Sequence, residues 1–163
     1  MLADGLARDG LTASARVQGG HGRGRLLGGV SRGGLQSLAP YSTFQARADR
    51  IKDEFVAFLI DAKRAGRSVA AYGAAAKGNT LLNYGGVKRD LLPFVCDAAP
   101  AKQGKFLPGS RIPILPPAAL TSRRPDYLLV LPWNLVDEVR DVNADLVDQG
   151  TKIVTAVPRL VIS

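Results

Sequence analysis

Cysteine, histidine and tryptophan are almost missing from this sequence, which has one of each in 163 residues. One cysteine excludes an intrachain disulfide and any cysteine-rich metal site, and one histidine excludes a histidine-cluster metal centre. No apolar run reaches the roughly 18 residues of a membrane span. What the sequence does have is positive charge: 22 Lys and Arg against 14 Asp and Glu, a formal +8. Taken alone, that balance suggests a polyanionic partner.

Residues 1–40 contain no aromatic residue, yet they hold 10 of the 18 glycines and five arginines. Glycine at this density has a high entropic cost of ordering, and no aromatic side chains offset that cost. We therefore expect a disordered Gly/Arg-rich leader, which also lacks the apolar run of a signal peptide. An arm for nucleic acid is the alternative, but such arms interleave aromatic residues, so nucleic acid is not the favoured partner. The only histidine, His21, lies in this leader.

Residues 41–163 alternate between helical and strand patterns and are expected to form one domain. Helices are predicted at about 43–65, 77–84 and 134–149, with a helical turn opening at 116–120. Strands are predicted at 68–72, 92–96, 112–114, 126–131 and 152–155, with a last edge at 160–162. Strands separated by helices require right-handed crossovers, so the sequence predicts an α/β fold with a doubly wound, mostly parallel sheet of about five strands.

Ligands bind such sheets beyond the carboxyl ends of the strands, which selects residues 73–80, 97–109, 131–134 and 156–158. In the first segment Gly73 and Gly78 have the spacing of a phosphate loop, but Lys77 precedes the second glycine, and no G-x-G-x-x-G occurs. A helix N-terminus with one lysine suffices for an anion site. The alternative is a close-packed turn whose small residues simply fit.

Asp97 ends the second predicted strand, where dinucleotide-binding folds place an acid that binds ribose. A cap or turn role for Asp97 is equally open. The loop that follows brings Lys102 and Lys105 to the same rim, or else is a solvated surface loop.

Other candidates have ordinary structural explanations. Trp133 is interpreted as core packing or as a lid over a ligand, with the structural role favoured, and Asn134 as a helix N-cap. Cys96 lies in a predicted strand and is expected to be buried. Glu54 and Glu138 lie on predicted helices, where a solvated role is favoured over acid–base work. No set of nucleophile, base and orienting group can be assembled.

The segment from Tyr72 to Tyr84, YGAAAKGNTLLNY, resembles the signature of the C-terminal domain of S-adenosylmethionine-dependent sugar C-methyltransferases. The similarity continues through Asp97 with PAKQG, LPG, IPI, PDY and LPWN, and it covers about residues 41–163. The resemblance implies a Rossmann-like domain that lines a cleft for a nucleotide-linked deoxysugar. The residues it carries over are Gly73, Ala74, Lys77, Gly78 and Asn79 in the cleft, with Lys77 near the diphosphate, and Asp97, Lys102 and Lys105 at the rim.

The resemblance also implies a three-part enzyme with a zinc-binding region, a middle domain that binds S-adenosylmethionine and this C-terminal domain. The chain contains neither of the first two parts, and Gly85 replaces the family's cysteine near the end of the first motif. We therefore expect a free-standing or truncated, cytoplasmic substrate-binding domain that binds no methyl donor and does not methylate alone. Its expected partners are a nucleotide-diphosphate sugar and a separately encoded catalytic domain, with no membrane. A non-catalytic nucleotide-binding or protein-interaction module is the alternative.

Overall fold

A computed structural model describes the chain from residue 39, with side chains from residue 43, to Ser163. The Gly/Arg-rich leader and His21 lie outside the described residues. Within residues 39–163, no helix has both the length and the apolar character needed to cross a bilayer.

One six-stranded sheet runs through this part of the chain, in the order β3-β2-β1-β4-β5-β6. Its strands are β1 (Val69–Tyr72), β2 (Val95–Cys96), β3 (Ile114–Leu115), β4 (Tyr127–Val130), β5 (Lys152–Thr155) and β6 (Val161–Ile162). The pairs from β3 to β5 are all parallel, and only β6 is antiparallel. The predicted α/β, mostly parallel sheet is thus confirmed, with one strand more than the expected five.

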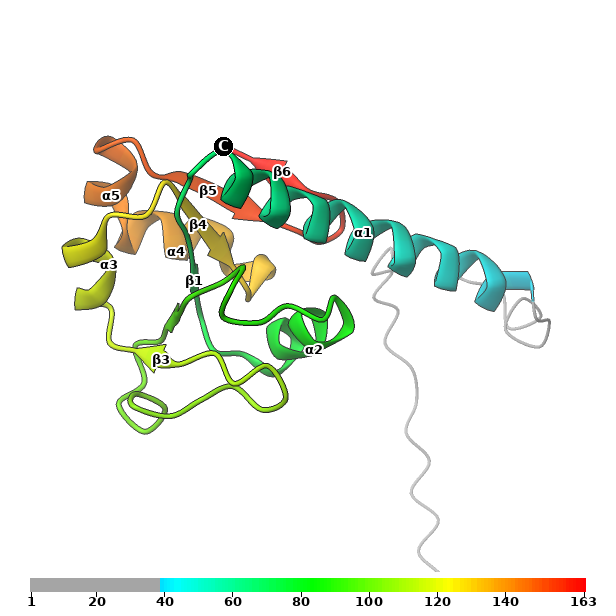
Figure 1. Ribbon diagram of the computed structural model, residues 1–163, viewed down its shortest axis with the longest axis horizontal. Coiled ribbons are helices and arrows are strands. Elements are labelled where there is room, and N and C mark those ends of the chain that lie inside the picture. Colours follow the sequence, from blue (N-terminus) through cyan, green and yellow to red (C-terminus); the bar gives the residue numbers. More distant parts are fainter. Residues whose placement is uncertain (1–38) are drawn as a thin grey trace, which may run out of the picture. The chain divides into compact units, whose positions relative to one another are not determined.

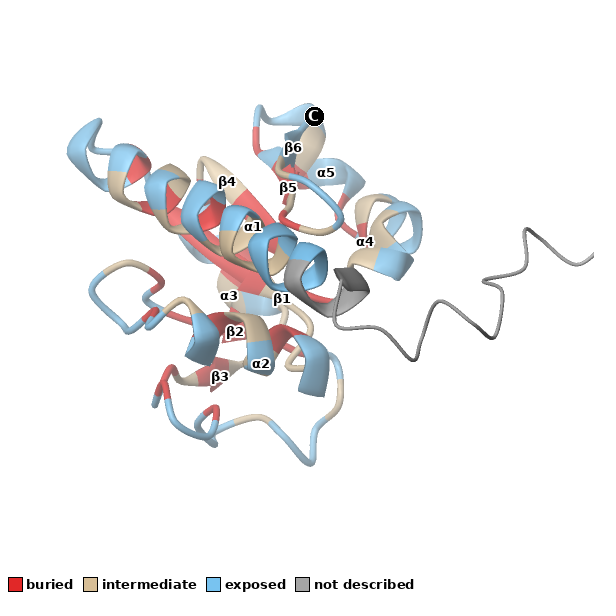
Figure 2. Ribbon diagram, turned by 90° about the vertical axis from the view of Figure 1, so that its right-hand side faces the viewer, coloured by how far each residue is buried: buried red, intermediate tan, exposed pale blue. Residues whose placement is uncertain are grey.

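Helices cover both faces of the sheet, as Figures 1 and 2 show. The helices are α1 (Ala39–Arg64), α2 (Ala76–Tyr84), α3 (Ala118–Arg123), α4 (Val136–Val142) and α5 (Ala144–Asp148), and a short 3-10 turn, η2 (Trp133–Leu135), precedes α4. Because side chains alternate along β1, Val69 and Ala71 pack in one core layer with α1 and α2, whereas Ala70 packs in the other with α3, α4 and α5.

The prediction of a single helix at 134–149 is wrong in one respect, because the helix is broken at Asn143. The buried Asn143 side chain donates from Nδ2 to the Val139 carbonyl at 2.7 Å. Its backbone leaves the helical region at φ −114° and ψ 26°. A side chain that bonds to the backbone in this way competes with the regular helix, and two short helices result.

The sheet reverses its winding direction at β1. From β1 the chain proceeds to β2 and β3 on one side, and then crosses to β4, β5 and β6 on the other. In open α/β sheets the crevice between the two halves, at the carboxyl ends of the strands, is where ligands bind. The fold therefore directs attention to the loops that follow β1, β2 and β4.

Candidate functional site

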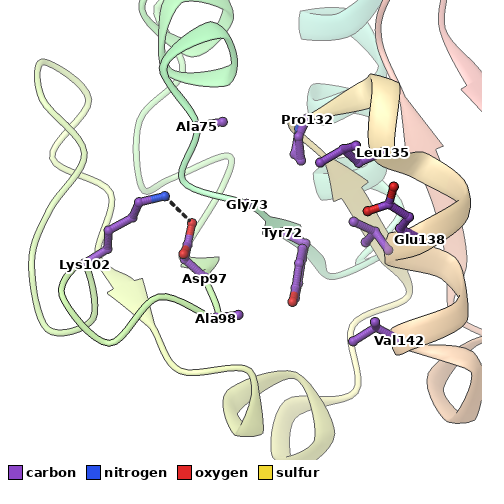
Figure 3. A pocket seen from close by; sticks show the side chains of 11 residues that line it. Tyr72, Gly73, Ala75, Asp97, Ala98, Lys102, Pro132, Leu135, Glu138 and Val142 are labelled. Carbon is purple, nitrogen blue, oxygen red and sulfur yellow. Dashed lines mark hydrogen bonds and ion pairs between the residues drawn. The ribbon is translucent and has the colours of Figure 1, made fainter.

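A cavity of about 320 Å³ lies at this reversal point, and Figure 3 shows its lining. It is bounded by the residues that follow β1, β2 and β4 and by one side of α4. The lining residues are Tyr72, Gly73, Ala75, Asp97, Ala98, Lys102, Pro132, Leu135, Glu138, Val139 and Val142. Three of the residues predicted for the site, Gly73, Asp97 and Lys102, are among them.

Gly73 makes the tight turn at the end of β1. Its φ of +88° is a conformation that glycine adopts without strain. A Cβ at this position would lie 2.5 Å from Cδ of Pro132, and the Gly73 N–H donates to the Cys96 carbonyl at 2.7 Å. The turn is therefore close-packed, and it joins the ends of three neighbouring strands.

Asp97 holds two loops of the site together. Its Oδ2 accepts from the Ala74 N–H at 2.7 Å and from Lys102 Nζ at 2.9 Å, and its Oδ1 accepts from the Ala99 N–H at 2.9 Å. Burial raises the pKa of Asp97, but these hydrogen bonds and the Lys102 charge outweigh burial and leave the pKa below its ordinary value. The carboxylate is thus ionised and engaged with three donors of its own chain.

The N-terminus of α2 opens beside the cavity without a side-chain cap. Ala75, the residue before the helix, lines the cavity and has no side-chain oxygen to accept from the first-turn N–H groups. The positive end of the helix dipole therefore lies at the rim.

Lys77 turns from α2 toward η2 rather than into the cavity. Its ammonium group lies 4.8 Å from the centre of the Trp133 ring, and it donates to Oδ1 of Asn134. The expectation that Asn134 caps a helix is wrong, because no side-chain cap bond is formed at η2 or α4. Trp133 is half-buried, and its ring serves as a support for the lysine.

The remaining predicted residues do not line the cavity. The Ala74 N–H is bound by Asp97, and Gly78 lets α2 approach β4, since a Cβ there would lie 2.5 Å from Cβ of Leu131. Oδ1 of Asn79 is buried without a partner among the described residues. Lys105 is exposed beyond β3, where its carbonyl accepts from the Ile114 N–H at 2.8 Å.

The structure adds residues that the sequence did not single out for this role. Tyr72 lines the cavity, and burial raises its pKa, with smaller contributions from Asp97 and Cys96. Glu138 is exposed, as expected, and it also projects from α4 toward the cavity in Figure 3. The position of Glu138 in the sequence could have indicated this role, because the first turn of a helix that follows a parallel strand lies at the carboxyl edge of the sheet. Among residues 43–163, no cluster of His, Cys, Asp and Glu is suited to a metal ion.

Comparison with known proteins identifies a family and a relative that this chain resembles. The family described as the C-methyltransferase C-terminal domain matches residues 24–158. A C-methyltransferase of Streptomyces niveus, NovU, is 34% identical over 125 residues, which is 77% of this chain and 30% of NovU. The chain therefore spans less than a third of the length of that relative.

Proposed function

Because this chain belongs to the C-methyltransferase C-terminal domain family, we propose that it binds the substrate of a sugar C-methyltransferase. The proposed substrate is a nucleotide-linked keto-deoxysugar, and the cavity at the sheet reversal is its binding site. A separately encoded catalytic domain is the proposed partner that carries out methyl transfer. Since activated sugars are made in the cytoplasm, the proposed role also places the chain there.

The observation that carries this proposal is the uncapped N-terminus of α2 beside a cavity at the switch point. A diphosphate bound there would accept hydrogen bonds from the first-turn N–H groups and would face the positive end of the helix dipole. Lys102 lines the same cavity, and Lys77 lies in the first turn of α2. Both ammonium groups are engaged within the chain, that of Lys102 with Asp97 and that of Lys77 with Asn134.

The described residues do not fit S-adenosylmethionine. In folds of this kind the acid at the end of the second strand binds ribose hydroxyl groups, which S-adenosylmethionine carries. The acid at the end of β2, Asp97, is already engaged with three donors. The isolated chain is therefore expected to bind substrate without turning it over.

The test is a binding titration followed through the only tryptophan, Trp133. A deoxythymidine diphosphate hexose should change its fluorescence, because a ligand that attracts Lys77 moves a charge off the indole ring. Lys77→Gln should raise the Kd by about threefold to tenfold, as expected for a charged hydrogen bond that is partly exposed. Lys105→Gln, which removes the same charge away from the cavity, is the matched control.

Two outcomes would contradict the proposal. If the sugar nucleotide does not bind at millimolar concentration, the substrate-binding role is wrong. If all nucleotides bind equally well, the alternative of a general nucleotide-binding module is favoured. A methyl-transfer assay with the purified chain, the methyl donor and a 4-keto sugar nucleotide should show no turnover.

A further inference from the structure

The two carboxylates of the cavity differ in what surrounds them. Asp97 is engaged with three donors from its own chain. Glu138, an exposed residue on the opposite wall, makes no hydrogen bond or ion pair with any residue from 43 to 163. The hydroxyl of Tyr72, which also lines the cavity, has no such partner in the same range. Figure 3 shows Tyr72 between the Asp97–Lys102 pair and the α4 wall.

The α4 wall of the cavity, which carries Glu138, suits a different part of a ligand from the rim formed by α2. A carboxylate repels phosphate but accepts strong hydrogen bonds from hydroxyl groups. The neighbours of Glu138 along the cavity are the apolar side chains of Leu135, Val139 and Val142. Apolar lining with a few placed polar groups suits the carbon face of a ring that carries hydroxyls. The α2 rim, with its helix terminus and Lys102, suits the anion instead.

We propose that Glu138, assisted by the Tyr72 hydroxyl, binds the ring hydroxyl groups of the ligand and thereby fixes its orientation in the cavity. In dinucleotide-binding folds an acid at the end of the second strand does this work. Here that acid, Asp97, is committed to holding two loops, and Glu138 on α4 takes over. The proposal rests on the proposed function, since it requires that a sugar nucleotide occupies this cavity.

A simpler role for Glu138 is to stabilise α4 from its first turn, where an acidic side chain interacts favourably with the helix dipole. Asp137 lies in the same turn with the same charge, and it does not line the cavity. The dipole therefore explains both acids equally, whereas binding concerns only Glu138. Asp137→Asn is for this reason the matched control for Glu138→Gln.

The experiment measures the Kd of a deoxythymidine diphosphate hexose by calorimetry for the full chain and its variants. Glu138→Gln should weaken binding on the order of tenfold, because a charged acceptor is lost. Tyr72→Phe should weaken it by a smaller factor, and Asp137→Asn should leave it unchanged. Glu138→Asp, which keeps the charge but shortens the reach, should also weaken binding. All variants should show the thermal unfolding midpoint of the unmodified chain within a few degrees.

A second set of ligands identifies which ring is bound. If the hydroxyl belongs to the ribose, 3′-deoxythymidine diphosphate should bind the unmodified chain more weakly than deoxythymidine diphosphate, and Glu138→Gln should not distinguish the two. If it belongs to the hexose, Glu138→Gln should weaken only the ligand that carries the hexose. S-adenosylhomocysteine, which also carries ribose hydroxyls, should bind no better to the unmodified chain than to Glu138→Gln.

The two proposals fail differently. If the unmodified chain binds the sugar nucleotide and Glu138→Gln binds it as well as Asp137→Asn does, the Glu138 proposal is wrong while the proposed function stands. If Glu138→Gln weakens pyrophosphate to the same extent, the loss does not involve ring hydroxyl groups and the Glu138 proposal is again wrong. If the unmodified chain binds no sugar nucleotide, both fall together.

Discussion

Only glycine fits at the position of Gly73, for two separate reasons, one in the backbone conformation and one steric. Its φ of +88° strains any residue with a Cβ, and that Cβ would lie 2.5 Å from Cδ of Pro132. The proline ring belongs to the loop after β4 and has little freedom to retreat. Gly73→Ala should therefore lower the free energy of unfolding by about 3 kcal/mol, combining backbone strain with overpacking. Urea denaturation measures the change.

Gly66 provides the control for this prediction, because it shares only the backbone constraint. Its φ is +67°, and nothing lies within 4 Å of the Cβ position. Gly66→Ala should lose about 1 kcal/mol from strain alone. An equal loss in the two variants would show that the contact with Pro132 does not limit this position.

The sequence predicted which residues reach the carboxyl edge of the sheet, but not where their side chains point. Gly73, Asp97 and Lys102 do line the cavity. Lys77 reaches the same edge, yet its ammonium group stacks on Trp133. The direction of a long side chain depends on partners from distant segments, and Trp133 follows Lys77 by 56 positions. Such pairings leave no local pattern that a single sequence could reveal.

Among the secondary-structure elements, β1 and β4 are joined at their amino ends by Asp126. Its Oδ2 accepts from the Ser68 N–H at 2.8 Å and from the Ser68 hydroxyl at 2.7 Å, while its Oδ1 accepts from Arg67 at 2.8 Å. The two Ser68 hydrogen bonds, followed by the one from Arg67, lower the pKa of Asp126 to about 2. The register of the two central strands thus has a polar clamp at the end opposite the cavity.

This clamp predicts how stability depends on acid. The ordinary pKa is 3.8, so the unfolded chain takes up the proton first as the pH falls. The contribution of Asp126 is complete above about pH 5 and should be lost progressively as the pH falls toward 2. Asp126→Asn should lower stability at pH 7 by about 1 kcal/mol and flatten this acid dependence. Urea denaturation between pH 7 and pH 2.5 measures both effects.

Asp61→Asn is the control for the acid prediction, because this carboxylate is exposed and lies 3.7 Å from Arg64. It should leave the pH dependence as it is. Because the pKa of Asp97 is also below its ordinary value, the stability of every variant should still fall somewhat in acid. The clamp explanation would be contradicted if Asp126→Asn and the unmodified chain lost stability in parallel below pH 5.

Local sequence patterns predicted the elements well where one periodicity runs without interruption. The strand expected at 152–155 matches β5, and the helix expected at 77–84 matches α2 to within one residue. The strand expected at 92–96 is only two residues long, because the Leu92 N–H bonds to the Lys88 carbonyl in a turn at 3.0 Å. Turns of this kind are made by the backbone, so an apolar run does not distinguish them from a strand.

At the scale of the whole molecule, the order of the strands follows from contacts that are remote in sequence. The alternation of strands and helices predicted a parallel, doubly wound sheet, and right-handed crossovers were expected. The alternation could not predict that β1 pairs with β4, across about 55 intervening residues. The antiparallel β6 has a local reason, since residues 156–160 are too few for a crossover connection.

Cys96 offers a test of this whole arrangement, because it is the only cysteine and lies in β2, between β3 and β1. It is fully buried, and its thiol donates to the Pro116 carbonyl at 3.3 Å. Burial raises the pKa of Cys96 to about 11, although Arg123 acts in the opposite direction. At pH 8 only about one thiol in a thousand would be ionised, and that thiol is also inaccessible to an aromatic disulfide reagent.

We therefore expect Cys96 to react with such a reagent only when the sheet opens. Without urea the reaction should be at least about a hundredfold slower than in the unfolded chain, whose thiol has an ordinary pKa. With increasing urea the reaction rate should rise along the same transition as Trp133 fluorescence, since both report the loss of one cooperative sheet. Ser122→Cys in a Cys96→Ser background, which presents an exposed thiol, should react at once. Rapid labelling of Cys96 without urea would mean that the β1–β2 half opens independently of the β4–β5 half.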